Sequence, residues 1–236
     1  MIRKFGILLS ALLAFFFTNV SFAQTFEGTI TMEISSAKLQ QPMTMVISTK
    51  GEKSATEMQT SQGSMKMYFD KTEGKMTTVI GKMGIQMDIK EAMDKAKEKK
   101  KDALSSKVTA TGEKQVINGH TCELYIVTAK DSNRSNWWMT ADLPKSLLNS
   151  LHNIYNNSAR APLGARSGSP GMEAIGEMFK KGLVPIKVEI LKEGKPETTM
   201  SFVSYEQKHL DNSVFEIPKD VIFQPLPTGM SGMGKE

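Results

Sequence analysis

Cysteine and histidine are nearly absent from this 236-residue sequence, which contains one cysteine and three histidines. A single cysteine, Cys122, excludes an intramolecular disulfide, and a zinc site needs about four nitrogen, sulfur or oxygen ligands. His120, His152 and His209 are scattered, and none lies near a G-x-S-x-G motif of the serine hydrolases. The sequence also has no P-loop, no G-x-G-x-x-G motif and no EF-hand loop. We therefore expect a protein that is not an enzyme, with no catalytic residues, no cofactor and no metal site of these types.

Cys122 and His120 raise one alternative, because residues two apart on a strand share a face and could form a thiol–imidazole pair. Cys122 shares that face with Leu124 and Ile126 as well. An apolar strand face of this kind favours a buried, inert thiol.

Long apolar runs are also missing, apart from one near the N-terminus. Arg3 and Lys4 precede an apolar run over 5–17, and small residues occupy positions 21 and 23. This pattern predicts a secretory signal peptide over 1–23 that is cleaved before Gln24. The run is too short for a membrane-spanning helix, which needs about 20 apolar residues, and no cysteine follows for a lipid anchor. We expect a periplasmic or secreted protein.

Charge of one sign is not concentrated in the sequence. The formal net charge is +5, and removing Arg3 and Lys4 with the signal peptide lowers it to +3. We therefore expect no nucleic-acid partner. The basic run Lys95–Lys101 is interrupted by Glu98 and lacks aromatic residues, which indicates a solvated helix face, with peripheral contact to the envelope membrane as the alternative. A monomer is expected.

Apolar and polar residues alternate through the first third of the chain after the signal peptide. "FEGTITMEI" (26–34) places Phe26, Ile30 and Met32 on one face, as in a half-buried antiparallel strand. Further strands are predicted at 43–48, 54–60, 65–70, 75–80 and 83–89, with glycine-containing turns between several of them.

The strongest local signal is Asn118–Gly119 between two apolar runs, which predicts a two-residue hairpin turn. This turn pairs Ile117 with His120, Gln115 with Cys122, and Lys114 with Glu123. Strands are also expected over 134–142, 183–194 and 197–207, with a final edge at 215–221. Helical spacing predicts helices at 90–106, 144–155 and around 175–179.

These patterns predict one α+β domain over 24–227, with a curved antiparallel sheet of about ten strands and two or three helices packed on one side. The Gly-, Pro- and Ser-rich stretch 157–171 is expected to be a flexible loop, and 228–236 a disordered tail.

Methionine is unusually common between Gln24 and Lys90, where nine methionines accompany a single leucine, Leu39. Alternation places eight of them on one apolar face, whereas Met58 lies in a strand whose pattern gives no clear phase. We take the following residues of this face as the candidate ligand-binding set: Met32, Met43, Met45, Met65, Met67, Met76, Met83, Ile85 and Met87.

Three interpretations of these methionines stay open. They could fill an ordinary core, because methionine packs into irregular gaps. They could form a deformable wall for an apolar ligand. They could also bind Cu(I), because "MTM" and "MKM" place thioethers about 7 Å apart along a strand.

Four segments in this order carry a family resemblance: "FEGTITMEI", "TGEKQVINGHTCELYIV", "NWWMTADLP" and "FEIPKDV". Together they resemble the exported-protein family known as domain of unknown function 4412. That family is similar in architecture to the LolA/LolB-like lipoprotein carriers of the bacterial envelope. The resemblance implies an unclosed half-barrel with helices on its concave side, and it supplies no catalytic residues.

The sequence thus leads to a non-enzymatic periplasmic protein that binds a hydrophobic ligand, such as an acyl chain or lipid, on a methionine-rich concave face. The alternatives are a Cu(I)-binding protein and a structural or interaction protein of the envelope without a small-molecule ligand.

Overall fold

The structure is a computed structural model that describes residues 25–37, 39–60, 63–89, 107–128, 134–158, 176 and 178–225. Within these residues, twelve strands form a single sheet. The first six are β1 (Glu27–Ser36), β2 (Met43–Lys50), β3 (Lys53–Thr60), β4 (Gly63–Asp70), β5 (Lys75–Ile80) and β6 (Met83–Asp88). The others are β7 (Lys107–Ile117), β8 (His120–Thr128), β9 (Arg134–Thr140), β10 (Val184–Lys192), β11 (Lys195–Gln207) and β12 (Ile222–Phe223).

The sheet consists of two meanders that meet at its centre. Strands β1 to β6 follow one another in space, as do β7 to β11, and β1 pairs antiparallel with β11 to join the two sets. All pairs are antiparallel except β12, which pairs parallel with β6 at one edge; β7 forms the other edge. The expected antiparallel, unclosed sheet is therefore confirmed.

Short turns set the register of the hairpins. Asn118 and Gly119 have φ values of 50° and 81°, as a tight hairpin turn of mirror-image type requires, and the predicted pairs of Ile117 with His120 and Lys114 with Glu123 are present. The β10–β11 hairpin turns in the same way at Glu193 and Gly194, with φ values of 52° and 80°.

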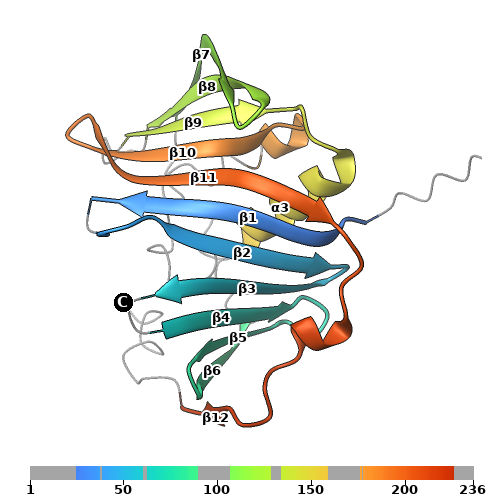
Figure 1. Cartoon of the computed structure of the whole chain (residues 1–236). Helices are drawn as coiled ribbons and strands as arrows, with labels where there is room; N and C mark the ends of the chain where they lie inside the picture. Colours follow the sequence, from blue (N-terminus) through green and yellow to red (C-terminus); the bar gives the residue numbers. More distant parts are fainter. Residues whose placement is uncertain are drawn as a thin grey trace, which may run out of the picture.

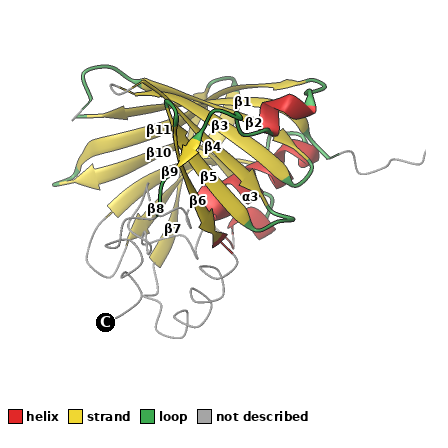
Figure 2. Ribbon diagram, turned by 90° about the horizontal axis from the view of Figure 1, so that it is seen from below, coloured by secondary structure: helices red, strands yellow, loops and turns green. Residues whose placement is uncertain are grey.

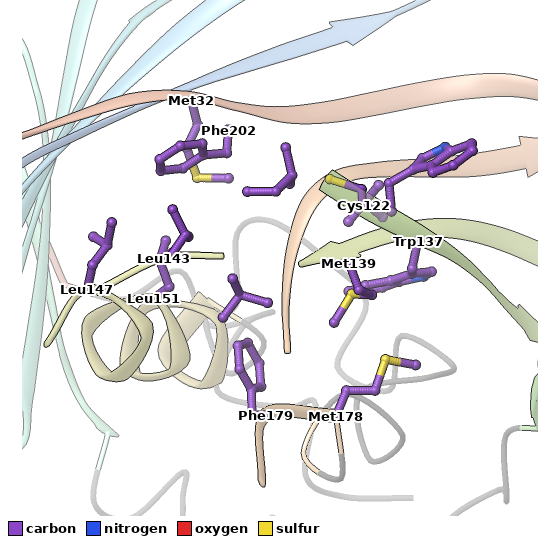
Figure 3. Close-up of a cluster of buried hydrophobic side chains, with 14 of the residues drawn as sticks. Met32, Cys122, Trp137, Met139, Leu143, Leu147, Leu151, Met178, Phe179 and Phe202 are labelled. Carbon is purple, nitrogen blue, oxygen red and sulfur yellow. The ribbon is translucent and has the colours of Figure 1, made fainter. Parts of the chain in front are cut away.

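The helix α3 (Lys145–Ser158) packs on the concave side of the curved sheet, where the strands bend around it (Figures 1 and 2). Leu147 and Leu151, one turn apart, are fully buried in a cluster that includes Met32 and Phe202 (Figure 3). The main core therefore lies between α3 and the strands at the centre of the sheet.

The helical content is lower than the α+β expectation. Among the described residues, α3 is the one long helix, accompanied by a short helical turn at 178–180 and the 3₁₀-helix η3 (Asn212–Phe215). The predicted helix at 90–106 lies outside the described residues, so the expectation of two or three helices is met only in part. Of the predicted loop at 157–171, the first two residues belong to α3 and the rest lie outside the described residues, as do 1–23 and 228–236.

The predicted edge strand at 215–221 is wrong. This stretch begins in η3 and continues without strand structure, and the edge strand is formed by the next residues, Ile222 and Phe223. The C-terminal segment runs from β11 past the ends of the first meander to reach this edge (Figure 1). There the Ile222 and Gln224 amides donate hydrogen bonds to the carbonyls of Lys82 and Gly84. Pro218 and the turn at 219–220 break the alternating pattern, because proline cannot donate to a ladder.

Candidate functional site

The strand register brings methionines of different strands side by side. Residues that pair directly across antiparallel strands share a face, with Cβ atoms about 4.5–5.5 Å apart. One row of such partners crosses β1 to β6, and we call it the methionine row: Met32, Met45, Met58, Met65, Ile80 and Met83. Five strand spacings make this row about 24 Å long. Five of its six members are methionines.

Two further rows run parallel to it. One contains Ile30, Ile47, Thr56, Met67, Thr78 and Ile85, and the other contains Gly28, Thr49, Ser54, Phe69, Met76 and Met87. Met43 lies beside the methionine row, opposite Ile34. All nine residues of the candidate set therefore lie on one face of β1–β6, which we call the methionine face.

Burial divides this face into four parts. Met32, with Met45 packed against its cluster, belongs to the main core under α3. Met76 and Met87 pair directly and form a separate small cluster with Ile89, against which Phe69 and Ile85 pack. Met43, Met65 and Met67 belong to neither cluster and are half-buried. Met83, on β6 next to the edge strand β12, is 58% exposed.

The cavity between α3 and the β2–β4 part of this face is small. A cavity of about 20 Å³ lies between Ser150 and Ile154 of the helix and Thr49, Ser54 and Phe69 of the sheet. It has about the volume needed for a single water molecule. This cavity therefore has no room for a larger ligand, and the half-buried Met43, Met65 and Met67 lie outside the packed clusters.

Two residues of the methionine row were not identified from the sequence. Met58 is 7% exposed and lies between Met45 and Met65 in the methionine row. Its strand, "KSATEMQT", has only one large apolar residue, so the pattern has no phase until the partner strands supply it. Ile80 ends β5 at the position between Met65 and Met83.

Thr78 adds a polar group to the methionine face. It lies between Met67 and Ile85 on neighbouring strands and is 3% exposed. Its Oγ1 is buried without a hydrogen-bond partner in the described structure. A buried hydroxyl without a hydrogen-bond partner destabilises the fold, because its desolvation is not compensated. A donor or acceptor that reached Thr78 Oγ1 would relieve this penalty.

The thiol of Cys122 is inert, as its strand context suggests. Cys122 is fully buried, its Sγ lies 3.4 Å from the carbonyl oxygen of His120, and burial raises the pKa of the thiol to about 11. The His120 Nδ1 lies 3.2 Å from the carbonyl oxygen of Asp142, and its ring packs edge-on against Phe202. Neither ring nitrogen is shown in contact with the thiol, so the pair lacks the geometry of an activated nucleophile.

Within the described ranges, no group of three or more His, Cys, Asp or Glu side chains could hold a metal ion. In the same part of the chain, every helix is too short or too polar to cross a membrane.

The chain belongs to the family described as a domain of unknown function (DUF4412), whose model matches residues 26–221. A search of curated proteins gives no match.

Several solved structures have a similar backbone fold. A crystal structure of MucB in complex with MucA(peri) has 10% identity and a TM-score of 0.41, and the match covers 83% of this chain and 55% of that one. The Pseudomonas aeruginosa MucA/MucB complex has 11% identity and a TM-score of 0.42, with coverage of 86% and 62%. A crystal structure of MucB alone has 9% identity and a TM-score of 0.40, and the match covers 82% of this chain and 58% of that one. This chain thus spans less than two thirds of the length of these structures, and the likeness concerns the fold alone.

Proposed function

We propose that this protein is a non-enzymatic binding protein that holds an elongated apolar ligand, such as an acyl chain or lipid, against the methionine face. The observation that carries the proposal is the methionine row, which crosses six strands and is half-buried along part of its length. A plain core would bury these side chains fully.

The choice of methionine supports a wall that adapts to its ligand. Methionine is unbranched and flexible, and such side chains can repack around apolar groups of different shapes. On the methionine face, Met43, Met65 and Met67 are best placed for this role, because they are half-buried and lie outside the two packed clusters. Met32 is 1% exposed and would contact a ligand only if α3 moved.

The proposal includes the setting that the sequence predicts. The mature protein starts at Gln24, forms one domain over 24–227, acts as a monomer in the periplasm or outside the cell, and meets its ligand at the envelope. Peripheral contact with the membrane surface fits such a ligand, whereas nucleic acid does not.

Equilibrium binding of a fluorescent acyl-chain probe to the delipidated mature protein tests the proposal. The double variant Met65→Gln/Met67→Gln keeps side-chain length but adds polarity, and we expect it to bind about tenfold more weakly, a loss of ~1.4 kcal/mol. Val46→Gln is the matched control, because Val46 is similarly placed on β2 but pairs with Thr31 and Glu57 on the opposite face. Absence of probe uptake, or equal affinity of all three proteins, contradicts the proposal.

Cu(I) is a second candidate ligand, favoured by the direct neighbours Met45, Met58 and Met65 on three successive strands. Thioethers are soft ligands that select Cu(I), and direct pairing brings them closer than spacing along one strand. The variant Met43→Leu/Met45→Leu/Met65→Leu/Met67→Leu separates the two candidates. It retains an apolar wall for an acyl chain but removes four sulfur atoms, so only Cu(I) affinity should fall in a titration under reducing conditions.

Native mass spectrometry of gently purified protein distinguishes the remaining possibility. A co-purifying lipid mass supports the main proposal, and a copper adduct supports the second. A chain that carries neither, and that crosslinks to an envelope protein, would instead indicate a structural or interaction protein.

A further inference from the structure

A second pocket lies away from the methionine face, between the first half of α3 and the segment 179–184. Its volume is about 260 Å³, far above the 20 Å³ of the cavity beside the sheet. Pockets for small molecules have volumes of about 300–1,000 Å³, so this pocket lies just below that range and suits a small ligand. The lining residues are Lys145, Leu148, Asn149, His152, Phe179, Lys180, Gly182 and Val184.

One wall of the pocket is a stripe of α3 at the margin of the main core, because Leu148 packs against that core and is only half-buried. Lys145, Leu148, Asn149 and His152 recur at three- and four-residue spacing, so they lie on one side of the helix. The buried residues Leu147 and Leu151 form the neighbouring stripe and face the sheet. The core therefore covers this second stripe only in part, and Lys145 and Asn149 stay exposed.

The side of the pocket opposite α3 is apolar. Val184 is 1% exposed and Phe179 is 9% exposed, and Phe179 is directed toward α3 (Figure 3). The His152 ring stacks on the Phe179 ring with centroids 4.6 Å apart and an interplanar angle of 16°. Gly182 also lines the pocket; it has a φ of 74° and contributes no side chain. An apolar group could lie along Leu148 and Phe179, whereas Val184 is too deeply buried to contact it.

The polar groups of the pocket are positive or neutral. Lys145 and Lys180 are exposed at its rim, and its described lining contains no carboxylate. Lys145 is also the first residue of α3, the end at which the helix dipole favours negative charge. Burial lowers the pKa of His152, so its ring is mainly neutral at pH 7 and can share a hydrogen bond with a ligand.

We propose that this pocket binds a small amphiphilic anion, a carboxylate with a short hydrocarbon chain. The chain packs on Phe179 and Leu148, and the carboxylate lies between Lys145 and Lys180, within reach of the Asn149 amide. This site is separate from the methionine face, because no residue of β1–β6 lines it.

Calorimetric titration of the mature protein with octanoate and with octyltrimethylammonium tests the charge preference, because the two probes share an eight-carbon chain and differ in the sign of the head group. We expect octanoate to bind and octyltrimethylammonium to bind much more weakly. Lys145→Gln/Lys180→Gln should weaken octanoate binding about two- to thirty-fold, as expected for two solvent-exposed ion pairs. The matched control is Lys192→Gln/Lys195→Gln, which removes the same charge about 26 Å away at the far end of β10 and should bind octanoate like the wild type.

His152 provides a readout of position. A carboxylate held beside the ring favours its protonated form, so the pKa of His152 measured by NMR should rise when octanoate saturates the protein. Equal binding of both probes, no binding of octanoate, no effect of Lys145→Gln/Lys180→Gln, or an unchanged His152 titration would each overturn the proposal. The methionine-face variant Met65→Gln/Met67→Gln should bind octanoate normally, so failure at one site is distinguishable from failure at the other.

Discussion

The side-chain amide of Asn118, in the β7–β8 turn, donates a hydrogen bond of 2.5 Å to the carbonyl oxygen of Phe202 on β11. Strands β9 and β10 separate β8 from β11 in the sheet order, so the two residues meet only because this half of the sheet curls strongly. The His120 ring packs edge-on against the Phe202 ring at 5.9 Å, next to the same bond. The turn is therefore anchored to the centre of the sheet.

Replacing Asn118 should separate its long-range bond from its role in the turn. Asn118→Gly keeps the positive φ but removes the amide, and we expect a loss of about 1 kcal/mol in the free energy of unfolding. Asn118→Asp places an acceptor against the Phe202 carbonyl and should cost more. Urea unfolding followed by circular dichroism measures both.

The β10–β11 turn supplies the control for this change. Glu193 has nearly the same φ, 52°, but glutamate tolerates this left-handed conformation less well than glycine or asparagine does. Glu193→Gly should therefore stabilise the protein by about 1 kcal/mol by relieving left-handed strain. If Asn118→Gly is as stabilising as Glu193→Gly, the bond to Phe202 contributes nothing.

The two turns illustrate what the sequence could predict. Asn118–Gly119 between apolar runs was sufficient to give the hairpin and its pairs, because turn type fixes register locally. The contact between Asn118 and Phe202 depends on the curl of three intervening strand pairs, which no local pattern encodes. Alternation likewise predicted which methionines share a face, but the methionine row required the register of five hairpins in succession.

The buried hydroxyl of Thr78 predicts a stabilising substitution. Thr78→Val removes an oxygen that has no partner and keeps the shape of the side chain, so we expect the free energy of unfolding to increase by about 1 kcal/mol. Thr77→Val is the control on the neighbouring position, where the hydroxyl accepts a hydrogen bond of 3.2 Å from the Gln86 amide and its loss should destabilise. Thermal unfolding gives both values, and a lower melting temperature for Thr78→Val would show that this hydroxyl is satisfied in solution.

Close packing at Gly84 predicts how the C-terminal segment is held. A Cβ at this position would lie 2.4 Å from Val221 Cγ1 and 3.2 Å from the Phe223 ring, so Gly84→Ala should displace the segment from β6. The amides of Ile222 and Gln224, which bond to Lys82 and Gly84, should then exchange with solvent faster.

Gly81→Ala is the control for this experiment, since a Cβ there meets nothing within 4 Å and costs only the strain of its φ of 59°. Unchanged exchange at Ile222 and Gln224 in Gly84→Ala would mean that β12 adjusts without detaching. The same packing explains why the edge strand was misplaced from the sequence: β12 has only two residues, and its position is set by contact with Gly84 and not by an alternating pattern.

The start of the C-terminal segment is tied to β1 and β2 by a carboxylate. Glu27 Oε1 accepts a hydrogen bond of 2.7 Å from the Leu210 amide and lies 3.2 Å from Lys50 Nζ and 3.0 Å from His209 Nδ1. Lys50 Nζ in turn donates to the Leu210 carbonyl at 2.7 Å. The bond from the Leu210 amide, followed by the interactions with Lys50 and His209, lowers the pKa of Glu27 below its ordinary value of 4.5.

Because the folded protein holds this proton less tightly than the unfolded chain, Glu27 stabilises the fold above the unfolded pKa, and this contribution disappears as the pH falls through the lower folded value. We therefore expect wild-type protein to lose stability from about pH 5 downward more steeply than Glu27→Gln, with urea midpoints measured at pH 6 and 3. Glu113→Gln removes an exposed carboxylate from the edge strand β7, far from β1 in the sheet order, and should keep the wild-type slope. Parallel curves for wild type and Glu27→Gln would mean that the Leu210 amide and Lys50 bind the neutral amide as well as the carboxylate, and that the tie between the segment and the sheet does not depend on charge.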